Sequence, residues 1–160
     1  MVDYDVFISC KSEDYPLAED VYSFLSENHI HAFLASKELR KLGDSEYREV
    51  IESALESAEH LIIVASKPEY IMSKYVKYEW GLFLNAKISD YKDGNIITIL
   101  NGIHPKDIAF ALRNYESFSF QAFRDGILSY VETNASIQRT KAAEEEKAKA
   151  LKRRKEEEEK

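Results

Sequence analysis

A single carboxylate, Glu79, stands among apolar side chains in a segment that is predicted to form a helix. The segment covers residues 73–86 and reads SKYVKYEWGLFLNA. Successive side chains on a helix are about 100° apart. One arc therefore carries Glu79 together with Tyr75, Tyr78, Leu82, Phe83 and Ala86. A carboxylate in such surroundings must be paired, neutralised by a proton or used for chemistry.

The sequence allows three interpretations of Glu79. It reaches solvent or a loop amide, or it forms an ion pair with Lys11 or Lys74. Alternatively, it faces a pocket beside Tyr75, one turn away, as a catalytic or ligand-holding carboxylate. The opposite side of the helix is also partly apolar, so the pattern leaves open which face meets the core. That side carries Trp80, Leu84 and Ile88.

A second set of candidate residues lies in the segment SKELRKLGDS and just beyond it. The segment is rich in cations, and a further lysine stands in a neighbouring strand-end loop. The set consists of Lys11, Lys37, Arg40, Lys41 and Arg48. Either these side chains are simply solvated, or they form a cationic rim for phosphates. Leu39 and Leu42 alternate with the charges, and exposed leucines on a loop indicate a protein contact or a lid.

Other chemistry has little support in the sequence. There is no glycine-rich dinucleotide motif, and NGIHP is not a phosphate loop. No Cys/His cluster has metal-ligand spacing, so we expect no metal site. The four histidines are expected in surface or capping roles. Cys10 ends a predicted strand and is expected to be a buried small hydrophobe, because no histidine lies in an obvious partner position for a nucleophile.

Composition limits the partners and the compartment. The chain has 160 residues, 44% of them hydrophobic, which suits one globular domain. Residues before 134 carry a net charge of −9, which argues against nucleic acid as the main partner. The single cysteine fits a reducing compartment, and the N-terminus does not resemble a signal peptide. The longest apolar run, LIIVA, is too short to span a membrane, so we expect a cytoplasmic protein.

Strand and helix patterns alternate about five times along residues 3–133. Three continuous apolar runs predict buried strands, namely 4–9, 60–66 and 95–100, and weaker candidates are 30–35 and 115–120. Helical patterns cover 17–25, 47–58, 73–86, a short stretch after residue 105, and 121–132. We therefore predict an α/β fold with a five-stranded, mostly parallel sheet and helices on both faces. Ligands bind such sheets beyond the carboxyl ends of the strands.

The last part of the chain is of a different kind. Residues 134–160 are rich in Glu, Lys and Arg and lack an apolar stripe. This composition predicts a charged helical tail or a linker. One interpretation is that the segment was cut from a longer protein. The expected organisation is one domain over 3–133 followed by this tail.

Three segments in this order resemble the boxes of the Toll/interleukin-1 receptor (TIR) domain family. YDVFISCKSED resembles the first box, and residues 35–66, with their long glycine-containing loop, helix and strand, resemble the second. SKYVKYEWGLFL resembles the segment in which enzymatic members keep an aromatic residue four positions before a catalytic glutamate, here Tyr75 and Glu79. Cys10 replaces an aromatic residue, Tyr75 replaces the more usual tryptophan, and the loop lacks the proline of animal signalling members. The chain looks like a bacterial member.

The resemblance implies a flavodoxin-like TIR fold and cleavage of NAD⁺ at the nicotinamide–ribose bond, giving ADP-ribose or a cyclic isomer in bacterial defence or signalling. NAD⁺ is then a substrate, and no cofactor is needed. Glu79 is the implied catalytic residue. The implied substrate-binding residues are Ser9, Lys11, Phe33, Ala35, Ser36 and Tyr75. The implied self-association loop contains Leu39, Leu42 and Gly43, and other TIR domains are its implied partners.

Two further functions remain open at this point. The chain is a non-enzymatic scaffold or decoy that works through homotypic TIR contacts, or it is a nucleoside-processing transferase of related shape. The presence of Glu79 favours an enzyme, because a scaffold has no need of a carboxylate at that position. Release of nicotinamide from NAD⁺ distinguishes the NAD⁺-cleaving enzyme from the scaffold. A comparison of NAD⁺ with deoxynucleosides as substrates distinguishes that enzyme from the transferase.

Overall fold

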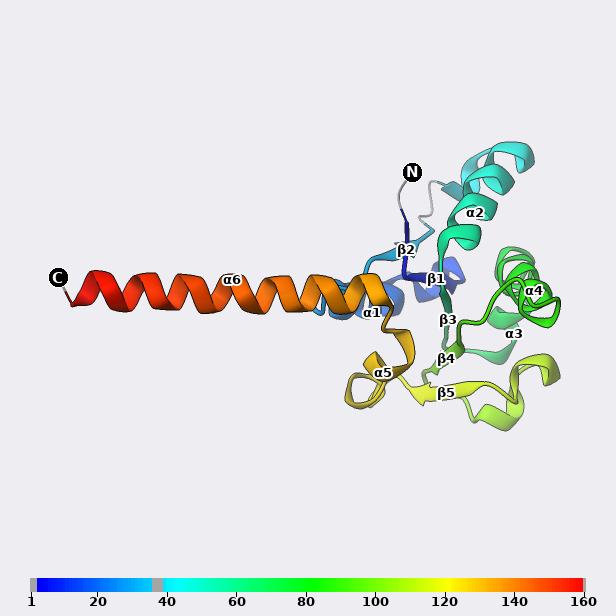
Figure 1. Cartoon of the computed structure of the whole chain (residues 1–160). Helices are drawn as coiled ribbons and strands as arrows, with labels where there is room; N and C mark the ends of the chain where they lie inside the picture. The colour runs from blue at the N-terminus through cyan, green and yellow to red at the C-terminus, as the bar shows by residue number, and fades with distance from the viewer. Residues whose placement is uncertain (1–2, 36–38, 160) are drawn as a thin grey trace.

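A five-stranded sheet forms the centre of the molecule (Figure 1). The structure is a computed structural model that describes residues 3–35 and 39–159. All four strand pairs are parallel, and the order is β2-β1-β3-β4-β5. The strands are β1 (Val6–Cys10), β2 (Ala32–Leu34), β3 (His60–Ala65), β4 (Ile96–Leu100) and β5 (Glu116–Ser119). The predicted α/β sheet is confirmed, and it is parallel throughout.

Helices connect the strands and cover both faces of the sheet. The α-helices are α1 (Tyr15–Glu27), α2 (Asp44–Ser57), α3 (Pro68–Ile71), α4 (Lys74–Ile88), α5 (Leu128–Val131) and α6 (Asn134–Glu158). The 3-10 turns are η1 (Ser12–Asp14), η2 (Leu39–Lys41), η3 (Pro105–Asp107), η4 (Phe110–Leu112) and η5 (Phe123–Asp125). Two expected helices are thus shorter than their patterns suggested: the stretch after residue 105 forms turns, and 121–132 is interrupted around Gly126.

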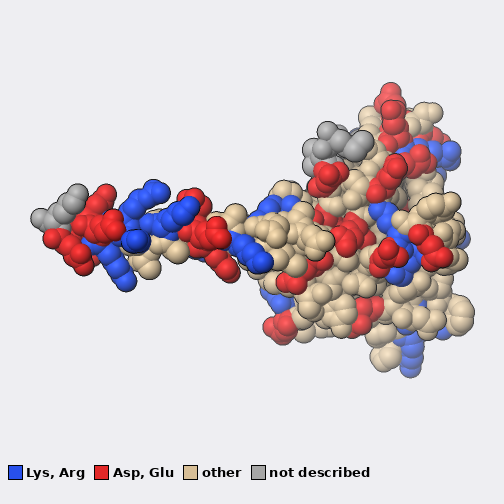
Figure 2. Space-filling view, viewed as in Figure 1, with Lys and Arg blue, Asp and Glu red and all other residues tan. Residues whose placement is uncertain are grey.

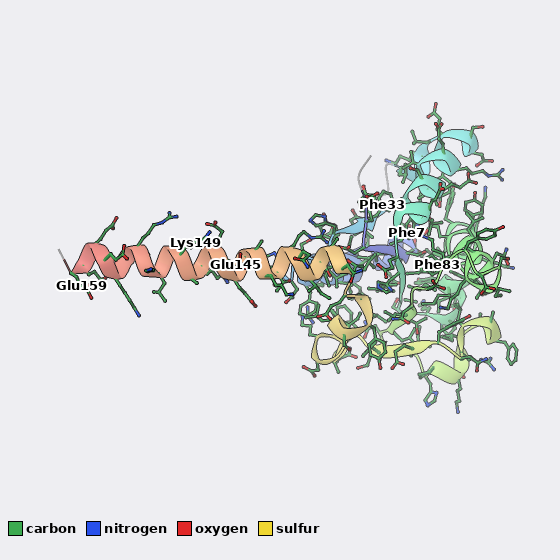
Figure 3. The ribbon with its side chains drawn as sticks, in the orientation of Figure 1. Phe7, Phe33, Phe83, Glu145, Lys149 and Glu159 are labelled. Carbon is green, nitrogen blue, oxygen red and sulfur yellow. The ribbon has the colours of Figure 1, made fainter. Side chains whose placement is uncertain are left out.

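Two apolar cores lie on the two faces of the sheet. One contains Phe7, Tyr47, Trp80 and Phe83 and is covered by α2 and α4, and Figure 3 shows Phe7 and Phe83 on this side. The other is covered by α1 and α5 and contains Val21, Leu25, Phe123, Ile127 and Val131. Strands β1, β3 and β4 are buried along their whole length because helices cover both of their faces. This explains why their sequences are continuous apolar runs.

The charged tail forms a helix, as expected, and projects from the body (Figure 1). Thr133 and Ser136 form a capping box at its start, with each side chain bonded to the other's backbone N–H. Beyond its first turns the helix is exposed, and Figure 2 shows both signs of charge along it. No described helix is long and apolar enough to cross a bilayer.

Candidate active site

Glu79 lies on α4 and is fully buried, with 0% exposure. Helix α4 packs against β1 and β3, so this carboxylate comes close to the carboxyl end of β1. Ser9, one residue before the end of that strand, donates a hydrogen bond from its Oγ to Glu79 Oε1 over 2.7 Å. The carboxylate therefore sits at the sheet edge where parallel α/β folds bind their ligands.

Two further side chains complete the surroundings of Glu79. The Tyr47 hydroxyl, from α2, donates a hydrogen bond to Oε2. Arg40, from η2, places its Nη2 3.4 Å from Oε1. The ionic partner of Glu79 is thus Arg40, not Lys11 or Lys74. Lys11 instead pairs with Glu13 over 3.0 Å.

The protonation of Glu79 reflects opposing influences. Burial raises the pKa of this carboxyl above its usual value. The Arg40 charge and the hydrogen bonds from Tyr47, Ser9 and Arg40 lower the pKa, but the net direction is upward. Burial and the neighbouring carboxylate also raise the pKa of Tyr47, so this phenol stays a hydrogen-bond donor. A carboxylate with a raised pKa and specific donors is typical of functional sites.

Tyr75 lies one turn before Glu79 and belongs to the same cluster. Its ring meets the Tyr47 ring edge to face, with centroids 4.8 Å apart. The Arg40 guanidinium carbon lies 5.5 Å from the Tyr75 ring centroid, and the Tyr75 hydroxyl donates to the Arg40 carbonyl at 3.5 Å. Turn η2 therefore contacts both Tyr75 and Glu79, and it covers the carboxylate.

A cationic pocket of about 460 Å³ adjoins this cluster. Its lining consists of Lys11, Ser12, Arg40, Lys41, Ser73, Lys74 and Tyr75. Arg40 therefore faces both the pocket and Glu79. Its Nε is buried and has no hydrogen-bond partner among the residues that the structure describes. A buried unpaired N–H donor is costly, so this arrangement favours binding of an anionic oxygen beside Arg40.

The other residues implied by the resemblance lie in several places. Phe33 stacks on Phe7 at 5.1 Å and lines a separate groove on the β2 side. Ala35 is buried in the core beneath α2 and α4, and Ser36 and Lys37 lie outside the described residues. The structure thus brings Ser9, Lys11, Tyr75 and Glu79 together but does not place Phe33 in the same pocket.

The residues implied in self-association differ in their exposure to solvent. Leu42 is 40% exposed, whereas Leu39 is half-buried against the core. Gly43 is the residue that precedes α2. The exposure expected for both leucines therefore holds for Leu42 alone.

Tyr47 and the Arg40–Glu79 pairing were not identified as site features from the sequence. The helical pattern over 47–58 begins with Tyr47, and this spacing predicts a core residue there. Arg40 was one of several cations in the loop. A tyrosine hydroxyl needs a polar partner when it is buried. A tyrosine at a core position of a predicted helix was therefore the feature of the sequence that could have indicated a polar site.

Cys10 is buried at the end of β1, and burial raises the pKa of its thiol to about 12. Because the unperturbed value is 9.0, the thiolate fraction at mildly alkaline pH falls about a thousandfold. We expect iodoacetamide to alkylate Cys10 at least that much more slowly in the folded protein than in urea, as measured by mass spectrometry. Equal rates in both states would contradict this assignment.

Among the described residues, no group of three or more His, Cys, Asp or Glu side chains is arranged to hold a metal ion. The candidate chemistry therefore rests on one buried carboxylate, its hydroxyl donors, a tyrosine ring and a cationic pocket. These features lie together at the ligand-binding edge of a parallel α/β sheet.

The sequence profile of the TIR domain family matches residues 6–128, so the chain belongs to the TIR domain family. No curated protein sequence matches the chain.

Solved structures with a similar fold include a metazoan TIR-STING receptor from C. gigas. It is 19% identical with a TM-score of 0.61, and the match covers 81% of this chain but only 40% of the receptor. The TIR domains of the activated Roq1 resistosome, which directly recognises the pathogen effector XopQ, are 20% identical with a TM-score of 0.51. That match covers 79% of this chain and 74% of the other. These likenesses concern the fold.

Proposed function

We propose that this TIR domain cleaves NAD⁺ at the nicotinamide–ribose bond, releasing nicotinamide and ADP-ribose or a cyclic isomer, in the cytoplasm of a bacterium and in defence or signalling. The observation that carries the proposal is the buried Glu79 carboxylate, held by Ser9 and Tyr47 beside a cationic pocket. Membership of the TIR family supports it, because the family includes enzymes of this kind.

One carboxylate is enough for this reaction. Glycosidases usually need a second carboxyl group as the acid that protonates the leaving oxygen. The leaving group of NAD⁺ is a cationic pyridinium that departs as neutral nicotinamide, so no general acid is required. The bond to ribose breaks with its electron pair on the nicotinamide nitrogen. Glu79 would hold the ribose hydroxyls and stabilise the oxocarbenium ion, or trap it covalently. Water then adds to the same carbon and loses a proton to give ADP-ribose, or another group of the same molecule attacks that carbon to give a cyclic isomer. Apolar surroundings strengthen this electrostatic stabilisation.

The neighbouring residues suit the rest of NAD⁺. The Tyr75 ring, which lines the cationic pocket, would stack on nicotinamide. The diphosphate suits the pocket formed with Lys11, Arg40 and Lys74, where the unpaired Arg40 Nε would gain an acceptor. Because Glu79 is fully buried beneath Arg40, the ribose reaches it only after η2 moves away. Substrate binding would drive this movement, because the Arg40 guanidinium would leave Glu79 and pair with the diphosphate instead.

Incubation with NAD⁺ at high protein concentration tests the proposal directly. Nicotinamide release is expected, whereas deoxynucleosides are expected to stay intact. Cleavage of deoxynucleosides instead would support a transferase. Intact NAD⁺ together with self-association would support the non-enzymatic scaffold, which the closed cover over Glu79 and the exposed Leu42 also favour.

Self-association is proposed to support activity through the loop that contains Leu42. We expect Leu42→Asp to lower the rate per molecule about tenfold or more, because a charge in an apolar contact weakens assembly. Leu151→Asp is a matched control, since Leu151 is also exposed but lies on the projecting α6. The wild-type rate per molecule should also fall on dilution. A flat dilution series together with full activity of Leu42→Asp would rule this out.

A further inference from the structure

Tyr47 makes two contacts that link the proposed catalytic carboxylate to the proposed stacking ring. Its hydroxyl donates to Glu79 Oε2, and its ring meets Tyr75 with centroids 4.8 Å apart. The residue is only 4% exposed, and its backbone belongs to α2, whereas both partners lie on α4. One side chain from a neighbouring helix therefore fixes the relative positions of two groups that the reaction would use.

The two oxygens of Glu79 are held by different elements. Oε1 accepts from Ser9 on β1 and faces Arg40 on η2, while Oε2 accepts from Tyr47 on α2. Cys10 on β1 is a further titratable group near the carboxylate. When Arg40 withdraws to admit substrate, Oε1 keeps Ser9 and Oε2 keeps Tyr47. These two hydroxyls then define the orientation of the carboxylate.

We propose that Tyr47 is a positioning residue for NAD⁺ cleavage: its hydroxyl orients the Glu79 carboxylate and its ring holds Tyr75 in place. This role depends on the proposed function. Tyr47 touches Glu79 and Tyr75 and acts on the substrate through them. The two parts of the role are separable, because phenylalanine removes the hydroxyl and keeps the ring, whereas leucine removes both.

Tyr47→Phe is expected to reduce kcat about tenfold while KM for NAD⁺ changes less than about twofold, because one charge-assisted hydrogen bond is lost. The pKa of Glu79 should rise further without this donor. Glu79 acts as the ionised form, so the acid limb of the kcat profile should move to higher pH, and part of the lost activity should return there. Tyr47→Leu should in addition raise KM, since Tyr75 loses its neighbour.

A matched control exists between the same two helices. The Tyr78 hydroxyl on α4 donates to Glu52 on α2 over 2.8 Å, at an exposed position. Tyr78→Phe therefore removes the same kind of bond without touching Glu79, and it should leave kcat, KM and the pH profile unchanged. All variants are assayed well below their own thermal midpoints, so a merely structural effect of Tyr47→Phe does not enter the comparison.

A titration without substrate separates this role from the proposed function. Carbon-13 NMR of glutamate-labelled protein, with the Glu79 signal assigned by its loss in Glu79→Gln, reports the pKa of that carboxyl. It should rise in Tyr47→Phe and stay constant in Tyr78→Phe. If the wild type does not cleave NAD⁺, the proposed function fails while the titration still measures the contact. An unchanged Glu79 pKa and an unchanged pH profile in Tyr47→Phe would overturn the positioning role.

Discussion

Glu79→Gln is expected to lower the rate of nicotinamide release from NAD⁺ by about a thousandfold, equivalent to about 4 kcal/mol of transition-state stabilisation. Glutamine fills the same space and keeps an oxygen for Ser9 or Tyr47, but it lacks the charge that would stabilise the oxocarbenium ion. Arg40 loses its ionic partner in this variant, so the thermal midpoint should fall. The fold should survive, because glutamine leaves no cavity and Arg40 also lines the pocket. Nicotinamide chromatography and thermal unfolding measure the two effects.

The control for this substitution is Glu52→Gln. Glu52 is also bonded to a tyrosine hydroxyl across α2 and α4, but it is exposed. Its replacement should leave the rate unchanged. Wild-type activity in a folded Glu79→Gln protein would mean that Glu79 is a structural residue and that another group performs the cleavage.

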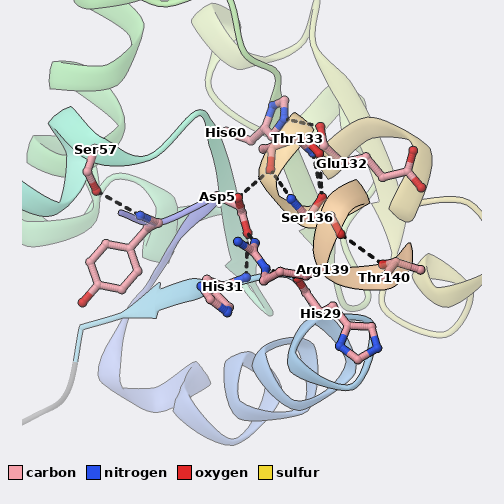
Figure 4. Close-up of polar contacts among 11 residues, drawn as sticks. Asp5, His29, His31, Ser57, His60, Glu132, Thr133, Ser136, Arg139 and Thr140 are labelled. Carbon is pink, nitrogen blue, oxygen red and sulfur yellow. Dashed lines mark hydrogen bonds and ion pairs between the residues drawn. The ribbon is translucent and has the colours of Figure 1, made fainter. Parts of the chain in front are cut away.

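Asp5→Ala is expected to have the largest effect on stability, lowering the free energy of unfolding by about 3 kcal/mol. Asp5 is buried just before β1, and Figure 4 shows the polar contacts that meet there. Its Oδ1 accepts from Thr133 Oγ1 over 2.6 Å, its Oδ2 accepts from the His31 backbone N–H over 2.8 Å, and Arg139 forms an ion pair with it. Removing the carboxylate leaves these donors unsatisfied.

Urea denaturation measures this effect, with Asp3→Ala as the control because Asp3 is exposed. The control should change the free energy of unfolding by less than about 0.5 kcal/mol. Asp5 lies before the first residue of β1 and Ser9 lies next to its last, so the rate per folded molecule should be unchanged. A loss of less than about 1 kcal/mol in Asp5→Ala would contradict the stabilising role of these contacts.

The strands were the most predictable part of the fold. β1, β3 and β4 are covered on both faces, so each leaves a continuous apolar run in the sequence. The segment 121–132 was less predictable: its helical spacing is real, but it forms η5 and α5 on either side of Gly126. Tertiary packing of Phe123 and Ile127 satisfies the apolar pattern without a continuous helix.

The site was predictable only along its own helix. The spacing of Tyr75 and Glu79 follows from helical geometry. The pattern left open whether Glu79 is buried, and the structure shows that it is. The partners Arg40 and Tyr47 lie 39 and 32 residues away along the chain, and only the packing of η2 and α2 on α4 brings them to the carboxylate. Periodicity describes one element at a time, so contacts between elements escape it.

The attachment of the tail shows the same limit. Composition predicted a charged helix but not its anchor, which joins Arg139 to Asp5 across 134 residues of sequence. Arg139 also donates from its Nε to the His29 carbonyl at 2.9 Å, and this holds the start of α6 against the body. The remainder of the helix projects from this anchor (Figure 1).

Cleavage of NAD⁺ by Glu79 is tested by a product chromatogram of NAD⁺ incubated with the wild-type protein at high concentration, with Glu79→Gln in parallel. We expect nicotinamide in equal amount to ADP-ribose or a cyclic isomer from the wild type, and almost none from Glu79→Gln. Intact NAD⁺ in both samples, or equal nicotinamide release by both proteins, would show that Glu79 does not catalyse this cleavage.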